Sequence, residues 1–276
     1  MKIINYPDNG KYVINDLNET SLTYKINTYE DLFLLKSIKD ANPNLKEITI
    51  PCMFQQQHDR RFNQNESFEL KLVCEFINSI GFEKVKVFHP HSDVTPALLN
   101  NCEVIDNEKF ITIVLHTLGK NFPSRAIDKY CKTTNNLYFD KRVEENTILM
   151  STDSGGFKSL MKLCKQLDWK GETYSASKSR SYENGESKLI QVVDRQDFGG
   201  KDVLIVDDIL VGGNTFLGLA KLLQNRNVGK LYLAVSHTTI NNPNKELEKY
   251  FTKIFTTDSK GIDYNLENLN TIKLFS

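Results

Sequence analysis

Short apolar runs alternate with amphipathic stretches along most of this sequence. The four aliphatic residues at 203–206 are typical of a strand covered on both faces, as in a parallel sheet flanked by helices. By the same reasoning we expect strands at residues 12–14, 47–54, 85–88, 110–115, 147–152, 203–206, 230–235, 253–257 and 271–275. This order of elements predicts an α/β fold built from right-handed β-α-β units.

Helical spacing of apolar residues fills several of the intervals between these strands. Residues 29–41 carry such a pattern, and residues 66–80 place Phe68, Leu72, Phe76 and Ile80 on one side, with Gly81 as the expected cap. Further helices are expected at residues 125–131, 157–167, 216–224 and 243–251. Because the chain is too long for one ordinary core, we expect two domains, at residues 1–145 and 146–276.

A hairpin is indicated in the second half of the chain. The dipeptide Asn184-Gly185 lies between two runs that read as strands, at residues 174–180 and 188–193, and Asn-Gly is the strongest short hairpin signal. Lys178 and Arg180 are two residues apart, so they would lie on one face of the hairpin.

The chemistry concentrates in the stretch from residue 203 to 215. Asp207 and Asp208 follow the apolar run, at the end of the strand where open α/β sheets bind ligands. Gly212 and Gly213 allow a tight turn, and Thr215 is expected to cap the next helix, whose N-terminus could bind an anion. The simpler alternative is a buried strand with an acidic, solvated edge.

Two familiar nucleotide-binding motifs are absent from the sequence. None of the Gly-Lys pairs is followed by Ser or Thr, so there is no P-loop, and no G-x-G-x-x-G follows a strand. The stretch resembles instead the ribose-phosphate loop of the type I phosphoribosyltransferase fold.

Three other polar segments follow predicted strands. Residues 55–65 form a segment too long for a tight connection, although a solvated turn would look the same. The turn His89-Pro90-His91-Ser92-Asp93 could reach a divalent cation or a nucleotide phosphate, without resembling a zinc site. The third segment, Asp153-Ser154-Gly155-Gly156, repeats the order of acid, glycines and helix seen at 207–216.

Composition narrows the possible partners and compartment. The 35 basic and 35 acidic residues give a formal charge of zero, which argues against a nucleic-acid partner. No apolar run is long enough for a membrane span, and the polar start does not resemble a signal peptide. The five widely spaced cysteines indicate reduced thiols and a cytoplasmic protein.

Three blocks in this order resemble ribose-phosphate pyrophosphokinases, also called PRPP synthetases. They are His58-Asp59-Arg60-Arg61, then His91 after an apolar strand, then Val206-Asp207-Asp208 with its glycine loop. That family has an Arg-Gln-Asp-Arg segment that binds ATP, an Asp-Leu-His turn, a Ser-Pro-Asp-x-Gly-Gly turn, and a flag with a catalytic lysine and arginine. The resemblance runs in order and spacing from about residue 29 to 274.

The resemblance implies two tandem type I phosphoribosyltransferase-like domains, each a mostly parallel sheet flanked by helices. It assigns Gln57, His58, Asp59, Arg60 and His91 to ATP, His91 and Asp153 to the metal, Lys178 and Arg180 to catalysis, Asp207 and Asp208 to the ribose hydroxyls, and Gly212, Gly213, Asn214 and Thr215 to the phosphate. The implied metal is Mg²⁺, with Mn²⁺ as a substitute, and ATP is the implied co-substrate. A homodimer or higher homo-oligomer is expected.

The sequence also departs from the family pattern. Gln57 and His58 stand where the family has Arg-Gln, His89 replaces an acid, Val211 replaces an acid in the ribose-phosphate loop, and Asn214 replaces a glycine. These changes remove one cation near ATP and one acceptor near the sugar.

The implied reaction transfers the diphosphoryl group of ATP to the anomeric hydroxyl of ribose 5-phosphate, giving PRPP and AMP. Because the loop is altered at Val211 and Asn214, a larger acceptor such as ADP-ribose, which would point to NAD metabolism, stays open. The less favoured alternatives are a phosphoribosyltransferase that consumes PRPP and a catalytically silent regulatory subunit.

Overall fold

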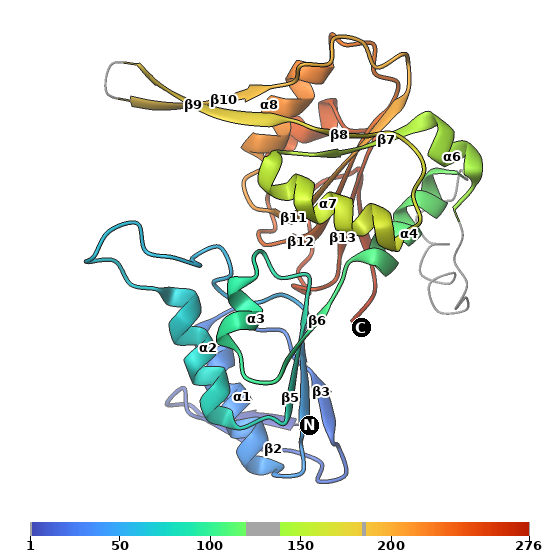
Figure 1. Ribbon diagram of the computed structural model, residues 1–276. Helices are drawn as coiled ribbons and strands as arrows, with labels where there is room; N and C mark the ends of the chain where they lie inside the picture. Colours follow the sequence, from blue (N-terminus) through green and yellow to red (C-terminus); the bar gives the residue numbers. More distant parts are fainter. Residues whose placement is uncertain (1, 120–138, 184–185, 276) are drawn as a thin grey trace. The chain divides into compact units, whose positions relative to one another are not determined.

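The structure, a computed structural model, describes residues 2–119, 139–183 and 186–275, with 178–183 and 186–191 described by their backbone (Figure 1). The chain forms two compact units. Unit 1 consists of Met1–Asp106 with Ser259–Gly261 and Phe275, and unit 2 consists of Asn107–Asp258 with Ile262–Leu274 and Ser276. The division falls at Asp106, earlier than the expected residue 145, because the helix that follows Asp106 packs on the sheet of unit 2.

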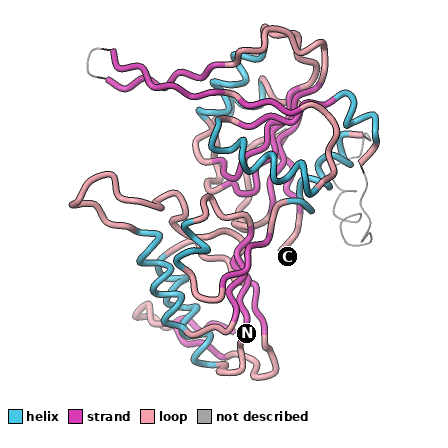
Figure 2. Tube along the Cα trace, viewed as in Figure 1, coloured by secondary structure: helices cyan, strands magenta, loops and turns pink. Residues whose placement is uncertain are grey.

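Unit 1 is built on a parallel four-stranded sheet. Its strand order is β3 (Ser21–Thr23), β4 (Glu47–Ile50), β5 (Lys84–Phe88) and β6 (Cys102–Ile105). The antiparallel hairpin of β1 (Lys2–Asn5) and β2 (Lys11–Ile14) is separate from this sheet. Helices α1 (Tyr29–Ala41), α2 (Glu69–Ile80) and α3 (Val94–Leu98) complete the unit, and the tube in Figure 2 shows α1 and α2 beside the strands.

Helix α1 forms where the spacing predicted it. Thr28 caps it, since its side chain accepts a hydrogen bond from the N–H of Asp31 while the Asp31 carboxylate accepts from the N–H of Thr28. Helix α2 ends at Gly81 in the left-handed conformation, as expected. Its buried face was predicted in part: Ile80 is buried and Phe68 and Phe76 pack against the core, but Leu72 is 53% exposed. The other buried side chains of the helix are Leu70, Val73, Cys74 and Ile77.

Unit 2 is built on a parallel six-stranded sheet. Its strand order is β14 (Leu269–Ile272), β13 (Lys253–Thr257), β12 (Leu231–Thr238), β11 (Asp202–Leu210), β7 (Thr147–Ser151) and β8 (Thr173–Ser175). The helices are α4 (Glu108–Leu118), α6 (Lys141–Asn146), α7 (Ser154–Gln166), α8 (Asn214–Leu223) and the 3₁₀ turn η1 (Lys245–Lys249). The antiparallel hairpin of β9 (Ser177–Glu183) and β10 (Glu186–Val192) projects beyond the sheet (Figure 1).

The topology places helices on both faces of the larger sheet. From β7 the chain crosses outward to β8, whereas from β11 it crosses in the opposite direction to β12. Because both crossovers of parallel strands are right-handed, α7 and α8 must cover opposite faces. Strands buried on both sides explain the continuous apolar runs, and β12 is buried at every position.

Several predicted elements differ from the structure. The segment 110–115, expected to be a strand, lies inside helix α4, because a short apolar run looks the same in a buried strand and a buried helix. The expected strand 174–180 is divided between β8 and β9, and the expected helix 243–251 is the short turn η1. The expected domain boundary at 144–146 lies inside α6, and the helix expected at 125–131 lies outside the described residues.

Burial raises the pKa of the thiols of Cys74, Cys102 and Cys164. The pKa of Cys74 is raised to about 12 and that of Cys164 to about 11, in both cases chiefly because burial disfavours the thiolate. In the described parts of the chain, no helix has the length and apolar character needed to cross a membrane.

Candidate functional site

The acidic pair Asp207-Asp208 lies on β11, at the carboxyl edge of the sheet of unit 2. The strand runs beyond the predicted residue 206 to Leu210, and Asp207 pairs with Val235 of β12. On the other side, pairing with β7 stops at Ile205 and Met150. The acids are therefore part of a paired strand that extends past β7, and the turn after β7 lies beside them. The two acid-bearing turns are neighbours, as the sequence predicted.

Protein hydrogen bonds hold the carboxyl group of Asp207 at both oxygens. The hydroxyl of Thr152 donates to Oδ2 at 2.8 Å, and the backbone N–H of Asp208 donates to Oδ1 at 2.9 Å. Burial, and next the charge of Asp208, raise the pKa of Asp207 to about 7, while the bond from Thr152 acts in the opposite direction. A carboxyl group that titrates near neutral pH is typical of a functional site.

The turn after β7 carries the predicted metal ligand Asp153. This residue is the N-cap of α7, and its Oδ1 accepts a hydrogen bond from the N–H of Gly156 at 2.9 Å. The hydroxyl of Ser151 donates to the carbonyl of Asp153 and also contacts the hydroxyl of Ser175 on β8. The turn is therefore fixed from both neighbouring segments, and Asp153 has one oxygen engaged in capping the helix.

The predicted phosphate loop lies between β11 and α8. Gly213, at φ +86°, is the N-cap of α8, and a Cβ there would come within 2.8 Å of Leu247 Cδ1, so both backbone and space require glycine. The expectation that Thr215 caps the helix was wrong, because the helix begins at Asn214 and Thr215 lies inside it. Asn244 supports the loop, since its N–H donates to the carbonyl of Gly212.

The predicted catalytic pair lies on the projecting hairpin. Lys178 of β9 is paired with Gln191 of β10, and Arg180 is paired with Leu189. They occupy alternate positions of one strand, as the sequence indicated.

In unit 1 the predicted ATP segment lies on the loop between β4 and α2. Gln55 has a positive φ of 60°, and its Oε1 lies 2.6 Å from Nδ1 of His58. Its amide also donates to the hydroxyl of Tyr29, which donates in turn to Glu69 at 2.7 Å. The ring of His58 is thereby oriented by groups outside its own turn.

The charged part of this loop faces solvent. The Arg60 side chain is 72% exposed, lies 3.9 Å from Asp59, and stacks over the exposed ring of Phe62. Gln57 and His58 are also exposed. The loop therefore presents its polar groups to solvent for a ligand.

Gln56 was missed by the sequence reasoning. It is 2% exposed, its Oε1 accepts a hydrogen bond from the N–H of His91 at 3.1 Å, and its Nε2 donates to Sγ of Cys52. Gln56 therefore joins the ATP loop to the turn that carries His91. A string of three glutamines gave no sign of which one is buried.

The predicted metal ligands belong to different units, His91 to unit 1 and Asp153 to unit 2. Within the described ranges there is no cluster of three or more His, Cys, Asp or Glu side chains suited to hold a metal ion. A metal bound at either residue would therefore need water and substrate oxygens as further ligands.

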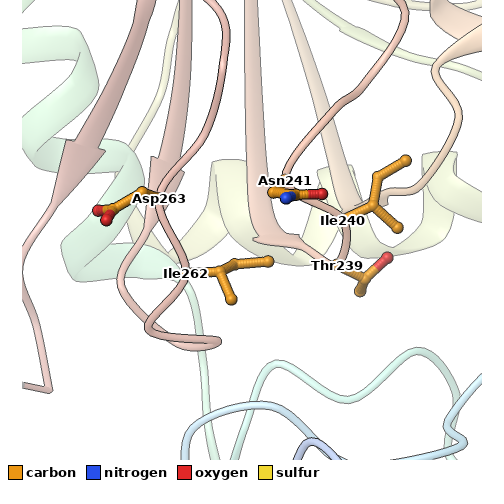
Figure 3. A pocket seen from close by; sticks show the side chains of 5 residues that line it. All are labelled: Thr239, Ile240, Asn241, Ile262 and Asp263. Carbon is orange, nitrogen blue, oxygen red and sulfur yellow. The ribbon is translucent and has the colours of Figure 1, made fainter.

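A hollow of about 430 Å³ lies on the loops that follow β12 and β13 (Figure 3). It is lined by Thr239, Ile240, Asn241, Ile262 and Asp263. The N–H of Thr239 donates to the carbonyl of Leu210, directly before the predicted phosphate loop. Because these strands are parallel, the hollow and the loop share one edge of the sheet.

Comparison with known proteins agrees with this architecture. The phosphoribosyl transferase domain matches residues 124–268. Ribose-phosphate pyrophosphokinase of Methanobrevibacter smithii is 23% identical over 79% of this chain and 71% of its own length, and that of Aquifex aeolicus is 27% identical over 81% and 64%. The chain thus spans about two thirds of the length of these curated relatives.

A solved structure supports the same fold. Phosphoribosylpyrophosphate synthetase from Mycobacterium smegmatis superposes with a TM-score of 0.70 over 99% of this chain and 85% of that one, at 15% identity. Both the domain match and this superposition indicate the type I phosphoribosyltransferase fold. The chain therefore belongs to the phosphoribosyl transferase domain family, as a divergent member of its ribose-phosphate pyrophosphokinase group.

Proposed function

We propose that the protein transfers the β,γ-diphosphoryl group of ATP to the anomeric hydroxyl of ribose 5-phosphate. The observation that carries this proposal is the acidic pair on β11 beside a glycine loop at the N-terminus of α8. Carboxylates bind sugar hydroxyls and a helix N-terminus binds phosphate, so the two features together suit a phosphorylated ribose.

In the acceptor half, Asp207 and Asp208 accept hydrogen bonds from the 2- and 3-hydroxyls of the ribose. Backbone N–H groups of the loop from Gly212 to Thr215 hold its 5-phosphate. The anomeric oxygen attacks the β-phosphorus, the bond between the α-phosphate oxygen and the β-phosphorus breaks, AMP leaves, and the hydroxyl proton passes to solvent. The rate depends on positioning and charge neutralisation more than on covalent chemistry.

Lys178 and Arg180 supply the charge neutralisation. Negative charge develops on the diphosphoryl oxygens during transfer, and cations placed there stabilise the transition state. A two-stranded hairpin that projects from the sheet is a suitable carrier, because it can close over a bound substrate (Figure 1).

In the ATP half, the loop from Gln57 to Arg60 binds the nucleotide, together with His91. Mg²⁺ fits the available donors, because this ion retains several waters and takes only one or two protein ligands beside substrate phosphates. His91 and Asp153 are the candidate ligands, and the metal would neutralise triphosphate charge. Mn²⁺ would substitute, since it accepts the same oxygen donors.

A larger acceptor, such as ADP-ribose, is a second candidate. The hollow beside the predicted phosphate loop has room for a substituent beyond the ribose phosphate. Its two isoleucines and three polar side chains, Thr239, Asn241 and Asp263, suit an aromatic base. Val211, 38% exposed, adds apolar surface to the loop itself.

AMP release by the purified full-length chain tests both acceptors. ATP and Mg²⁺ are supplied with ribose 5-phosphate, with ADP-ribose, or with neither, and each reaction is repeated in EDTA. We expect acceptor-dependent AMP that disappears in EDTA. Pyrophosphate release from PRPP and a base, without AMP, would establish a phosphoribosyltransferase instead. A chain that releases no AMP with either acceptor would fit a regulatory subunit.

A further inference from the structure

Thr152 occupies a position from which one hydroxyl can set the geometry of the acidic pair. It follows the last residue of β7 and precedes the N-cap of α7, and only 2% of it is exposed. A buried hydroxyl needs a hydrogen-bond partner. That of Thr152 finds it on another strand, at Oδ2 of Asp207, 2.8 Å away.

This bond links Asp207 to the β7 side of the sheet, where pairing with β7 no longer does so. Pairing between β7 and β11 stops at Met150 and Ile205, so the side-chain contact is a further link between the ends of these strands. With Oδ1 held by the N–H of Asp208 and Oδ2 by Thr152, the plane of the carboxyl group is fixed. The side chain of Asp208 also hydrogen-bonds the carboxyl group of Asp207. A carboxylate has about four acceptor positions, so one remains for a hydroxyl of a ligand.

The turn from Ser151 to Gly156 has a side-chain hydrogen-bond donor where the family pattern has none. In the Ser-Pro-Asp-x-Gly-Gly turn that this segment resembles, a proline stands at the position of Thr152, and proline has no side-chain donor. The bond to Asp207 is therefore a property of this chain that the turn pattern does not supply.

We propose that Thr152 is a positioning residue that holds Asp207 in the orientation that accepts hydrogen bonds from the acceptor sugar, and thereby sets the affinity for that sugar. The inference rests on the proposed function, because it takes the ribose hydroxyls to be the ligands of Asp207. Thr152 itself touches no substrate in this scheme.

The test compares Thr152→Val, which keeps shape and removes the donor, with Thr152→Ser, which keeps the donor. We expect Thr152→Val to raise the KM and the Kd for ribose 5-phosphate about ten- to hundredfold, the range for a lost hydrogen bond to a charged group. The KM for ATP should change less than about threefold, and Thr152→Ser should restore most of the affinity. Thr147→Val, another buried threonine at the opposite end of β7, controls for general damage to the strand.

The outcomes separate this inference from the proposed function. If the wild type transfers diphosphate and Thr152→Val keeps its affinity for ribose 5-phosphate, the inference is overturned and the function stands. Equal losses for ribose 5-phosphate and ATP, or no rescue by serine, would also overturn it, because they indicate a structural role alone.

If the wild type does not bind ribose 5-phosphate, the proposed function fails, and a ligand-free measurement still decides the restraint on Asp207. The carboxyl ¹³C resonance of Asp207 should titrate at higher pH in Thr152→Val than in wild type. The hydroxyl of Thr152 stabilises the ionised carboxylate, so its removal raises the pKa of Asp207. Among the described residues, the charge that acts on the Asp207 carboxyl is that of Asp208 on the same strand. An unchanged titration overturns the inference.

Discussion

In unit 2 the acids Asp207 and Asp208 belong to a paired strand, whereas in unit 1 the segment from Gln57 to Arg60 belongs to a loop. The backbone of Asp207 is fixed by the register with β12, and its side chain is fixed at both oxygens. The ATP loop instead depends on side chains, since Gln56 joins it to the turn of His91 and Gln55 orients His58.

The difference indicates how each unit can respond to a ligand. A residue on a central strand keeps its position unless the sheet opens, so the proposed sugar site is preorganised at Asp207. A loop held by a few side-chain bonds can adjust at small cost, which suits the binding of a flexible triphosphate. We therefore expect single substitutions to change kcat or ligand affinity more in unit 2 than in unit 1. The largest change is expected in the hairpin of unit 2.

The largest effect is expected at the hairpin. Replacing Lys178 or Arg180 by Ala should lower kcat by about two to four powers of ten with small changes in KM, because their interaction exists mainly in the transition state. Steady-state kinetics of both variants, with Lys188→Ala on the partner strand as control, measure this. Near-normal kcat in both variants would show that Lys178 and Arg180 are not the catalytic cations. Arg60 and Arg61 would then be the first candidates.

The next effect concerns the acidic pair. Asp207→Asn should weaken ribose 5-phosphate binding about ten- to hundredfold, because a charged acceptor is lost, while ATP binding changes little. Calorimetric titration with each ligand gives the two affinities. Equal weakening of both would show that the separation of sugar and nucleotide sides between the units is wrong.

A smaller effect is expected in unit 1. Gln56→Met keeps the length of the buried side chain but leaves the N–H of His91 without this acceptor, so the KM for ATP should rise about three- to tenfold. The KM for the acceptor should stay within about twofold. Gln64→Met, at an exposed position of the same loop, is the matched control and should behave as wild type. A change in acceptor KM as large as that for ATP would contradict the comparison.

The last effect is one of stability and not of activity. Because the pKa of Asp207 is raised from 3.8 to about 7 by burial and by Asp208, folding disfavours its ionised form. The contribution of Asp207 to the free energy of unfolding is full below the pKa of the unfolded state, and it is lost as pH rises through 7. Asp207→Asn should therefore gain about 1–3 kcal/mol in unfolding free energy relative to wild type between pH 4 and pH 8. Denaturant unfolding across that range checks it, and a constant difference would be inconsistent with the raised pKa.

The sequence alone determined the features that depend on local chemistry. The capped helix α1, the left-handed Gly81, the Asn-Gly hairpin and the apolar strands around Asp207 each follow from the conformational preference or burial of a few adjacent residues. The order of these elements was sufficient to predict the parallel α/β architecture, and the resemblance of three colinear sequence blocks indicated the family.

Only the tertiary structure decided features in which distant segments compete or meet. Residues 110–115 form a helix and not a strand, and α2 buries Leu70 and Val73 instead of Leu72, because packing against the sheet selects between local alternatives of similar energy. Gly213, and not Thr215, caps α8, and Leu247, 34 residues further along the chain, fills the space that a side chain at Gly213 would need. The partners of Gln56 and Thr152 lie 35 and 55 residues away, so no local pattern could reveal them.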